Sequence, residues 1–391
     1  MSKLKKNQGE QNEYIFPYIQ QPREDRWQGD LFWPYVRKSP SDGEQSQPEN
    51  GTVHRGEIEG FGTWVLDESG LLKIDGKGKM PDWENTRSSR TPWYLFEDSI
   101  QSVQLATGIR SIGNDAFRYC DRLKSIKIPD SVTSIGDRAF FGCPSLTSIE
   151  IPEGAVSIGK SAFFACHSLM DITIPDSITS IGESAFWGCK SLTDIAIPNS
   201  VTNIDADTFL GCESLAKVTI PESITSIGFR AFTGCTSLTN VALPDSVTSI
   251  GDCAFEGCSS LTGIVIPASA TSIGDSAFED CSSLTGIVIP ASVTRIGNHA
   301  FEDCSSLTHI AILDSVTRIG DEAFSGCSSL ESVLIPDSVR SIGIGVFKGC
   351  DSLQEVIMPA RLKRMAGKKA WLFSERLSGY FGIEKRIIRF Y

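Results

Sequence analysis

Eleven cysteines recur every 23 residues along the chain. Cysteines can form disulfides or bind metal ions, so both possibilities are considered first. They are Cys120, Cys143, Cys166, Cys189, Cys212, Cys235, Cys258, Cys281, Cys304, Cys327 and Cys350. Disulfides are not expected, because equivalent side chains of stacked repeats point the same way and because the number is odd. Metal sites use clustered ligands such as Cys-x-x-Cys, which this step does not provide. We therefore interpret the ladder as buried, reduced thiols packed as small apolar side chains, which fits a reducing compartment.

The remaining reactive side chains follow no pattern that would bring catalytic partners together. Cys253 lies outside the ladder at a variable position and is the candidate for an accessible thiol. The carboxylates after the repeated turn glycine recur because they cap turns. The four histidines fall in a linker or at variable positions, without a recurring nucleophile or carboxylate partner. They are His54, His167, His299 and His309. The sequence thus predicts no enzyme, no catalytic or metal-binding residue and no cofactor.

The 23-residue unit recurs eleven times between residues 105 and 357. A fixed period of this length predicts a solenoid, in which each unit buries its apolar face against its neighbours. Within the second and third units, residues 146–151 alternate between apolar and polar side chains and predict a half-buried strand. Residues 132–135 predict a second short strand. Asp137 then stands where it could N-cap a single helical turn.

The segments outside the repeats differ from them in composition. Residues 1–57 are polar and rich in Gln, Glu, Ser and Pro, which predicts a flexible N-terminal arm. Residues 58–104 are expected to form an N-terminal capping module, with a β-hairpin of strands at 63–66 and 71–74. Residues 358–391 are predicted to be a basic C-terminal cap or tail, with an amphipathic closing helix over residues 370–377.

Charge is distributed unevenly along the chain, whose net charge is -12. Residues 105–357 carry 14 basic and 29 acidic side chains, whereas residues 358–391 carry 9 basic and 2 acidic ones. An acidic column argues against nucleic acid as a partner, since phosphate binding needs a basic surface. The sequence shows neither the apolar run of a signal peptide nor that of a membrane span. As written, it predicts a cytoplasmic protein, although the compartment itself remains unassigned.

The repeat resembles the BspA-like class of leucine-rich repeats, with the pattern Leu-x-x-Ile-x-Ile-Pro-x-Ser-Val-Thr-x-Ile-Gly-x-x-Ala-Phe-x-x-Cys. Residues 62–66, 70–82 and 92–93 look like the N-terminal module that often precedes such repeats. The resemblance implies a right-handed, curved leucine-rich-repeat solenoid with a parallel sheet and short helical turns. It also implies a non-enzymatic bacterial protein that binds other proteins, often in adhesion at the cell surface. In the fifth unit Asp205 replaces the turn glycine and Thr208 the alanine, and we expect Asp205 to distort the column.

The outward residues of successive strands should form one exposed sheet face, and part of it is apolar. We define the apolar strip as the second outward residue of units six to eleven, namely Ala242, Val265, Val288, Ala311, Leu334 and Ile357. His309 stands beside it in the first outward column. At ~4.8 Å per unit the strip is ~24 Å long and covers on the order of 250 Å², at the lower edge of what marks an interaction patch. Flanking glycines favour a docking surface, although β-propensity alone would also explain the pattern.

The arm contains two similar hexamers, Tyr14–Ile19 and Leu31–Val36. Each has an aromatic-Pro-Tyr core, with Phe16 and Tyr18 in the first and Trp33 and Tyr35 in the second, which could anchor in a groove. Two functions follow from these surfaces. The chain could be an interaction scaffold whose protein partner binds the apolar strip, or a self-assembling protein whose arm docks on a neighbouring chain. The arm could instead fold back over the first repeat.

Overall fold

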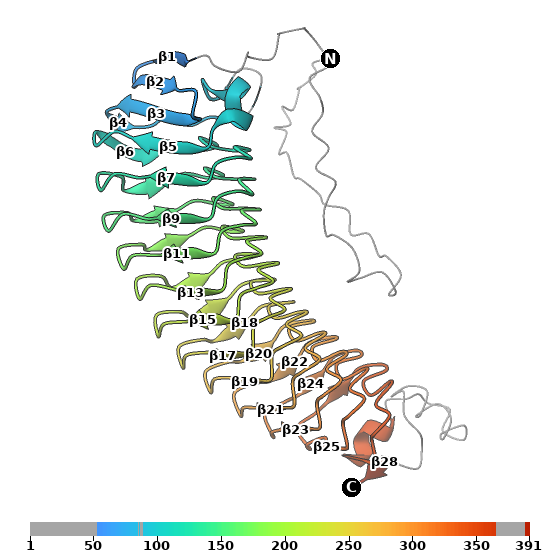
Figure 1. The fold of residues 1–391 in the computed structure, drawn as a ribbon. Coiled ribbons are helices and arrows are strands. Elements are labelled where there is room, and N and C mark those ends of the chain that lie inside the picture. Colours follow the sequence, from blue (N-terminus) through green and yellow to red (C-terminus); the bar gives the residue numbers. More distant parts are fainter. Residues whose placement is uncertain (1–52, 85, 87–88, 365–387) are drawn as a thin grey trace, which may run out of the picture. The chain divides into compact units, whose positions relative to one another are not determined.

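The protein is described by a computed structural model that covers residues 53–84, 86, 89–364 and 388–391. Contacts divide the chain into two units, Met1–Glu49 and Asn50–Tyr391, and the described residues belong to the second. This unit is a solenoid of stacked 23-residue coils (Figure 1), in which each coil adds a strand to two parallel ladders. The predicted leucine-rich-repeat solenoid with parallel strands is confirmed.

The first ladder carries the exposed sheet face, and its strands are three or four residues long. They are β5 (Ser102–Leu105), β7 (Ser125–Lys127), β9 (Ser148–Glu150), β11 (Asp171–Thr173), β13 (Asp194–Ala196), β15 (Lys217–Thr219), β17 (Asn240–Ala242), β19 (Gly263–Val265), β21 (Gly286–Ile289), β23 (His309–Ile312), β25 (Ser332–Leu334) and β27 (Glu355–Met358). In β9 the central Ile149 is buried and its two neighbours are exposed, as the alternation predicted. Neighbouring strands that pair do so in register, with each residue beside its equivalent in the next coil.

The second ladder consists of short strands that each end in a buried isoleucine. They are β6 (Ile109–Ile112), β8 (Ser134–Ile135), β10 (Ser157–Ile158), β12 (Ser180–Ile181), β14 (Asn203–Ile204), β16 (Ser226–Ile227), β18 (Ser249–Ile250), β20 (Ser272–Ile273), β22 (Arg295–Ile296), β24 (Arg318–Ile319) and β26 (Ser341–Ile342). This ladder has one interruption among these strands, between β12 and β14.

The interruption coincides with Asp205, as the sequence predicted. At the equivalent glycines an added Cβ would lie within 3.0 Å of the preceding coil's backbone; at Gly251 it would lie 2.8 Å from the carbonyl carbon of Gly228. The Cβ of Asp205 therefore keeps its coil from closing on β12. Thr208, the second departure in this coil, donates its hydroxyl to the Asp205 carbonyl at 2.8 Å.

The helical turn predicted after each glycine is absent from the described coils, which form turns there instead. Arg138 has φ 54°, and each described coil carries a residue with positive φ at the same position. This conformation breaks a right-handed helix, so that backbone N–H groups donate to the next coil, as from Phe140 to the Ala162 carbonyl at 2.8 Å. Asp137 does not cap its own turn; its carboxylate accepts a hydrogen bond from the Lys160 N–H at 2.7 Å.

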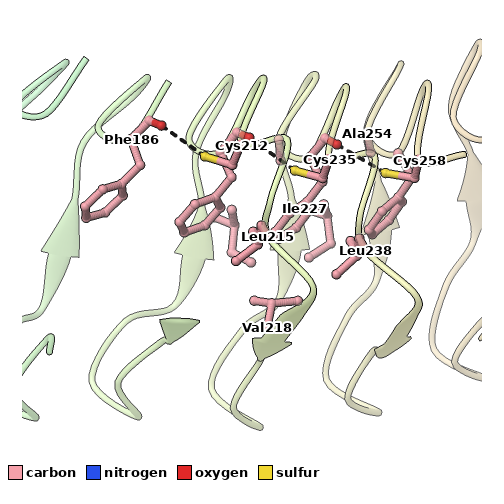
Figure 2. Packing of buried hydrophobic residues seen from close by; sticks show 14 of the residues in the cluster. Phe186, Cys212, Leu215, Val218, Ile227, Cys235, Leu238, Ala254 and Cys258 are labelled. Atoms are coloured by element: carbon pink, nitrogen blue, oxygen red, sulfur yellow. Dashed lines mark hydrogen bonds between the residues drawn. The ribbon is translucent and has the colours of Figure 1, made fainter. Parts of the chain in front are cut away.

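The core is a column of identical side chains repeated from coil to coil. Eleven phenylalanines, one per coil from Phe117 to Phe347, are less than 2% exposed. Their rings stack with centroids 5.3–5.9 Å apart. Figure 2 shows the leucines, isoleucines and cysteines that pack beside this stack. Every coil therefore presents the same surface to its neighbours, which allows them to stack without insertions.

The described ends of the solenoid depart from the repeat. The predicted hairpin is present as β2 (Gly62–Leu66) and β3 (Leu71–Gly76), and β3 pairs with β5. An additional strand, β1 (His54–Ile58), pairs with β2 and begins before the boundary expected at residue 58. Trp93 continues the phenylalanine stack, 5.9 Å from Phe117. The remaining elements here are β4 (Gly78–Lys79) and the 3-10 helix η2 (Tyr94–Ser99).

At the C-terminal end a 3-10 helix, η3 (Ala360–Arg364), follows the last repeat, and β28 (Ile388–Phe390) pairs in parallel with β27. The closing helix predicted over residues 370–377 lies outside the described residues.

Candidate functional site

The apolar strip lies on the strand face, where the short β-strands point alternate side chains outward. Val265, Val288 and Leu334 have exposed fractions of 75%, 62% and 54%. Ala242 and Ala311 are also exposed. Each central residue of these strands is buried, so that the outward residue contributes little to the core. Five of the six predicted strip residues are therefore available to a partner.

Ile357 differs from the rest of the strip because a strand distant in sequence lies beside it. Arg389 of β28 pairs with Ile357 and its guanidinium bridges to Glu355 at 2.8 Å. Ile357 is half-buried as a result. The fully exposed part of the strip therefore ends at Leu334.

The first outward column beside the strip contains Gly263 and Gly286, which place no side chain above the sheet. A Cβ built at Gly263 would meet no atom within 4 Å. At Gly286 it would lie 2.8 Å from the His309 Nε2 atom, so the exposed imidazole leans over this glycine. The other ring nitrogen of His309 is 2.9 Å from the Thr308 hydroxyl. His309 thus borders the strip, as predicted, and its ring is positioned by hydrogen bonding.

The arm residues Phe16, Tyr18, Trp33 and Tyr35 lie outside the described residues. Their role as docking anchors stays a prediction.

The ladder cysteines are buried and free, as expected. From Cys143 onward each thiol donates to the carbonyl of a core phenylalanine of the preceding coil, as Cys235 does to Phe209 at 3.3 Å. These hydrogen bonds are drawn in Figure 2 for three neighbouring coils. Burial raises the pKa of Cys166 to about 12, so that the thiolate needed for metal binding or nucleophilic attack is disfavoured.

Cys253 is half-buried and is less accessible than its irregular position suggested. Desolvation raises the pKa of its thiol, and the neighbouring carboxylates of Glu256 and Glu279 raise it further. A thiol held neutral in this way is a poor nucleophile. Nucleophilic catalysis would need the pKa of Cys253 to be lowered, and its surroundings act in the opposite direction.

One group of metal-ligating side chains escaped the sequence analysis. Single ligand atoms of His299, Glu302 and Glu322 lie within 4.8 Å of one another. The His299 Nδ1 atom is 2.5 Å from a Glu302 carboxylate oxygen, and Lys348 lies 3.7 Å from Glu322. The pKa of His299 is raised mainly by its hydrogen bond to Glu302. These ion pairs account for the cluster. Its signal in the sequence is that His299 is followed by Glu302 in the same turn and by Glu322 in the next repeat.

A row of stacked aromatic side chains on the turns was also missed. Phe164 stacks on Phe141 with centroids 4.4 Å apart and contacts Trp187 at 5.1 Å. Arg118 lies over the Phe141 ring and Arg230 over the Trp187 ring. The signal was an aromatic doublet in three consecutive units, in which the second aromatic follows the core phenylalanine. Because these residues are half-buried and covered by arginines, they stabilise the turns rather than offering an open surface.

Among the described residues, no helix has the length and apolar character needed to cross a membrane.

Comparison with protein families places the repeats in a known class. A family model described as a BspA type leucine rich repeat region matches residues 92–216, 202–330 and 271–375. A search of curated proteins finds no match.

Solved structures of bacterial proteins are similar in fold, among them the following two. A leucine-rich repeat protein from Bacteroides ovatus is 27% identical with a TM-score of 0.58, over 80% of this chain and 97% of that one. A leucine-rich repeat protein from Eubacterium ventriosum is 25% identical with a TM-score of 0.51, over 77% of this chain and 96% of that one.

Proposed function

We propose that this chain, which belongs to the BspA-type leucine-rich-repeat family, is a scaffold that binds a partner protein through the apolar strip. Solenoids of this family are generally non-enzymatic. Adhesion or surface recognition is the setting that the family resemblance favours. The strip is the surface through which we expect such recognition to occur.

The exposure of Val265 and Val288 carries this proposal. Large aliphatic side chains at 75% and 62% exposure bury little apolar surface on folding. Their alignment on adjacent strands concentrates this apolar surface in one place. Burial of such a surface by a partner would be favourable, at roughly 25 cal/mol per Å² before the costs of association.

The test is affinity capture with the full chain as bait, followed by quantitative mass spectrometry. The double variant Val288→Asp with Leu334→Asp places two charges on the strip. A control variant, Thr173→Asp with Ala196→Asp, places the same charges in the same column on β11 and β13, where both residues are exposed. Because all four side chains point away from the core, both variants should keep the wild-type melting temperature.

We expect the strip variant to lose its partner by about tenfold or more, while the control captures it as the wild type does. Equal capture by the two variants would show that the strip is not the binding surface. Unfolding of the strip variant alone would show that these side chains are structural.

A further inference from the structure

The partner segment can be specified further if the proposed function holds, since this inference rests on it. We infer that the apolar strip recognises an uncharged, apolar, proline-containing peptide segment in the polyproline II conformation, running along the solenoid across the strands. The argument uses the charges that border the strip, its repeat distance and its area.

At the centre of the strip, the residues on either side of the two outward valines carry no charged side chain, and the imidazole of His309 leans over Gly286. Residues 262–268 and 285–291 both read Thr-Gly-Ile-Val-Ile-Pro-Ala. Ala268 and Ala291 stand where the neighbouring units have Asp245 and Asp314. A charged segment laid over this centre would lose hydration without gaining an opposite charge. The surface therefore favours an uncharged partner.

Threonine side chains complete this neutral border. The hydroxyls of Thr262, Thr285 and Thr308 each donate to the carbonyl of the equivalent threonine in the preceding coil, at 3.1, 3.4 and 3.0 Å. Their donors are thus engaged within the solenoid, which leaves mostly methyl groups and spare acceptor capacity for a partner.

The repeat distance of the strip selects the conformation of the segment. Successive coils are ~4.8 Å apart, so that four steps, from Ala242 to Leu334, span ~19.2 Å. Two turns of polyproline II, at three residues per turn and ~3.1 Å per residue, span ~18.6 Å. Four turns of α-helix span ~21.6 Å, and the two-residue repeat of a β-strand, ~6.7 Å, does not match the coil step. Polyproline II stays in register with the coils.

Towards the C-terminal end of the strip, the spacing of the large residues agrees with this period, whereas Val265 and Val288 lie on adjacent coils. Val288 and Leu334 are two coils apart, with the short Ala311 between them. A polyproline II segment points one side chain per turn at the surface, about every 9.3 Å. Its side chain can then contact Ala311 between the two longer aliphatic groups.

The area of the strip favours a short segment over a second folded copy of this chain. The exposed strip from Ala242 to Leu334, ~19.2 Å long and ~10 Å wide, covers on the order of 190 Å², whereas a stable interface between folded proteins needs roughly 800 Å² on each side. An extended segment of six to eight residues fits this length. The hexamers Tyr14–Ile19 and Leu31–Val36 of this chain have the required composition and serve as defined probes.

The experiment measures binding of two synthetic peptides, carrying Tyr14–Ile19 and Leu31–Val36 between uncharged glycol linkers, to the full chain. Fluorescence anisotropy gives the affinity, and methyl spectra of valine and leucine locate the contact. We expect saturable binding that shifts the Val265, Val288 and Leu334 methyl signals. Pro17→Ala and Pro34→Ala in the peptides should weaken it about threefold or more, because the segment loses its preformed conformation.

The protein variants of the capture experiment complete the test. The strip variant should weaken peptide binding about tenfold and the control variant should not. Absence of saturable binding, or equal binding of the proline-free peptides, would overturn the inferred partner class. If the capture experiment still identifies the strip as the partner surface, only the class is wrong; if both experiments fail, the proposed function fails as well.

Discussion

Substitution of Gly251 by aspartate should reproduce the interruption that Asp205 causes in the fifth unit. The Cβ of a residue at position 251 would lie 2.8 Å from the Gly228 carbonyl carbon and 3.0 Å from the Ile227 oxygen. Backbone atoms cannot yield as a flexible side chain can, so the coil has to move away and open the ladder between β16 and β18.

The magnitude follows from the hydrogen bonds that this movement breaks. The N–H of Gly251 donates to Ile227 and that of Thr248 to Thr225, both at 2.9 Å. The equivalent residues of the fifth unit are Asp205 and Thr202. Within the described coils, their backbone N–H groups form no such hydrogen bonds to the preceding coil. At about 1 kcal/mol for each hydrogen bond, Gly251→Asp should cost ~2 kcal/mol of local stability.

Hydrogen exchange measured by mass spectrometry resolves this effect by position. A loss of ~2 kcal/mol corresponds to about a thirtyfold loss of protection in the amides of β16 and β18. The reverse substitution, Asp205→Gly, is the matched control. Asp205→Gly should gain ~2 kcal/mol from the restored hydrogen bonds and lose ~1 kcal/mol because glycine has more conformational entropy in the unfolded chain. The net gain of ~1 kcal/mol corresponds to about a fivefold increase in protection. Unchanged protection in Gly251→Asp would refute the packing argument.

Three further predictions concern the core, the thiols and the histidine pair. Phe255→Ala should lower the free energy of unfolding by ~3–5 kcal/mol in urea titrations, whereas Val265→Ala should change it by less than ~0.5 kcal/mol; similar costs would contradict the burial of the former. Thiol labelling of native protein should modify Cys253 at most, and more slowly than a free thiol, with the ladder cysteines reacting only in denaturant; rapid labelling of several thiols would exclude a buried ladder. The raised pKa of His299 means that its contact with Glu302 stabilises the fold fully below pH 6.5 and loses this effect as the pH rises through the folded-state pKa; an NMR titration should show the pKa falling in Glu302→Gln, and no change would rule out the pair.

The fold was predictable because each unit repeats the same local signals. The alternation around Ile149 specified a half-buried strand, and the constant length of the unit specified in-register stacking. The distortion at Asp205 was also predictable, since a side chain replaced a glycine that every neighbouring unit required. Propensity did not predict the turn conformation. Arg138 adopts positive φ because the gain lies in hydrogen bonds to the next coil, which no local pattern encodes.

The candidate site was predictable only in part. The strand alternation correctly placed Val265, Val288 and Leu334 on the exposed face. It could not indicate that Ile357 is half-buried, because the covering strand contains Arg389, which lies beyond the last repeat and follows a different pattern. The proximity of His299 to Glu322 requires the coil stacking to be known first. Single-sequence patterns therefore located the surface, while contacts between coils decided its limits.

The constant coil has a consequence for how this protein can change in evolution. Residues 258–280 and 281–303 differ at only four positions, which are Ala270/Val293, Ser272/Arg295, Asp275/Asn298 and Ser276/His299. Because neighbouring coils present the same phenylalanine, cysteine and leucine to each other, in-frame duplication or deletion of one whole unit preserves these repeated core contacts. Each event in this region adds or removes one valine and ~4.8 Å of apolar strip. A change in repeat number thus changes the length of the exposed apolar strip while each coil keeps neighbours with the same core residues.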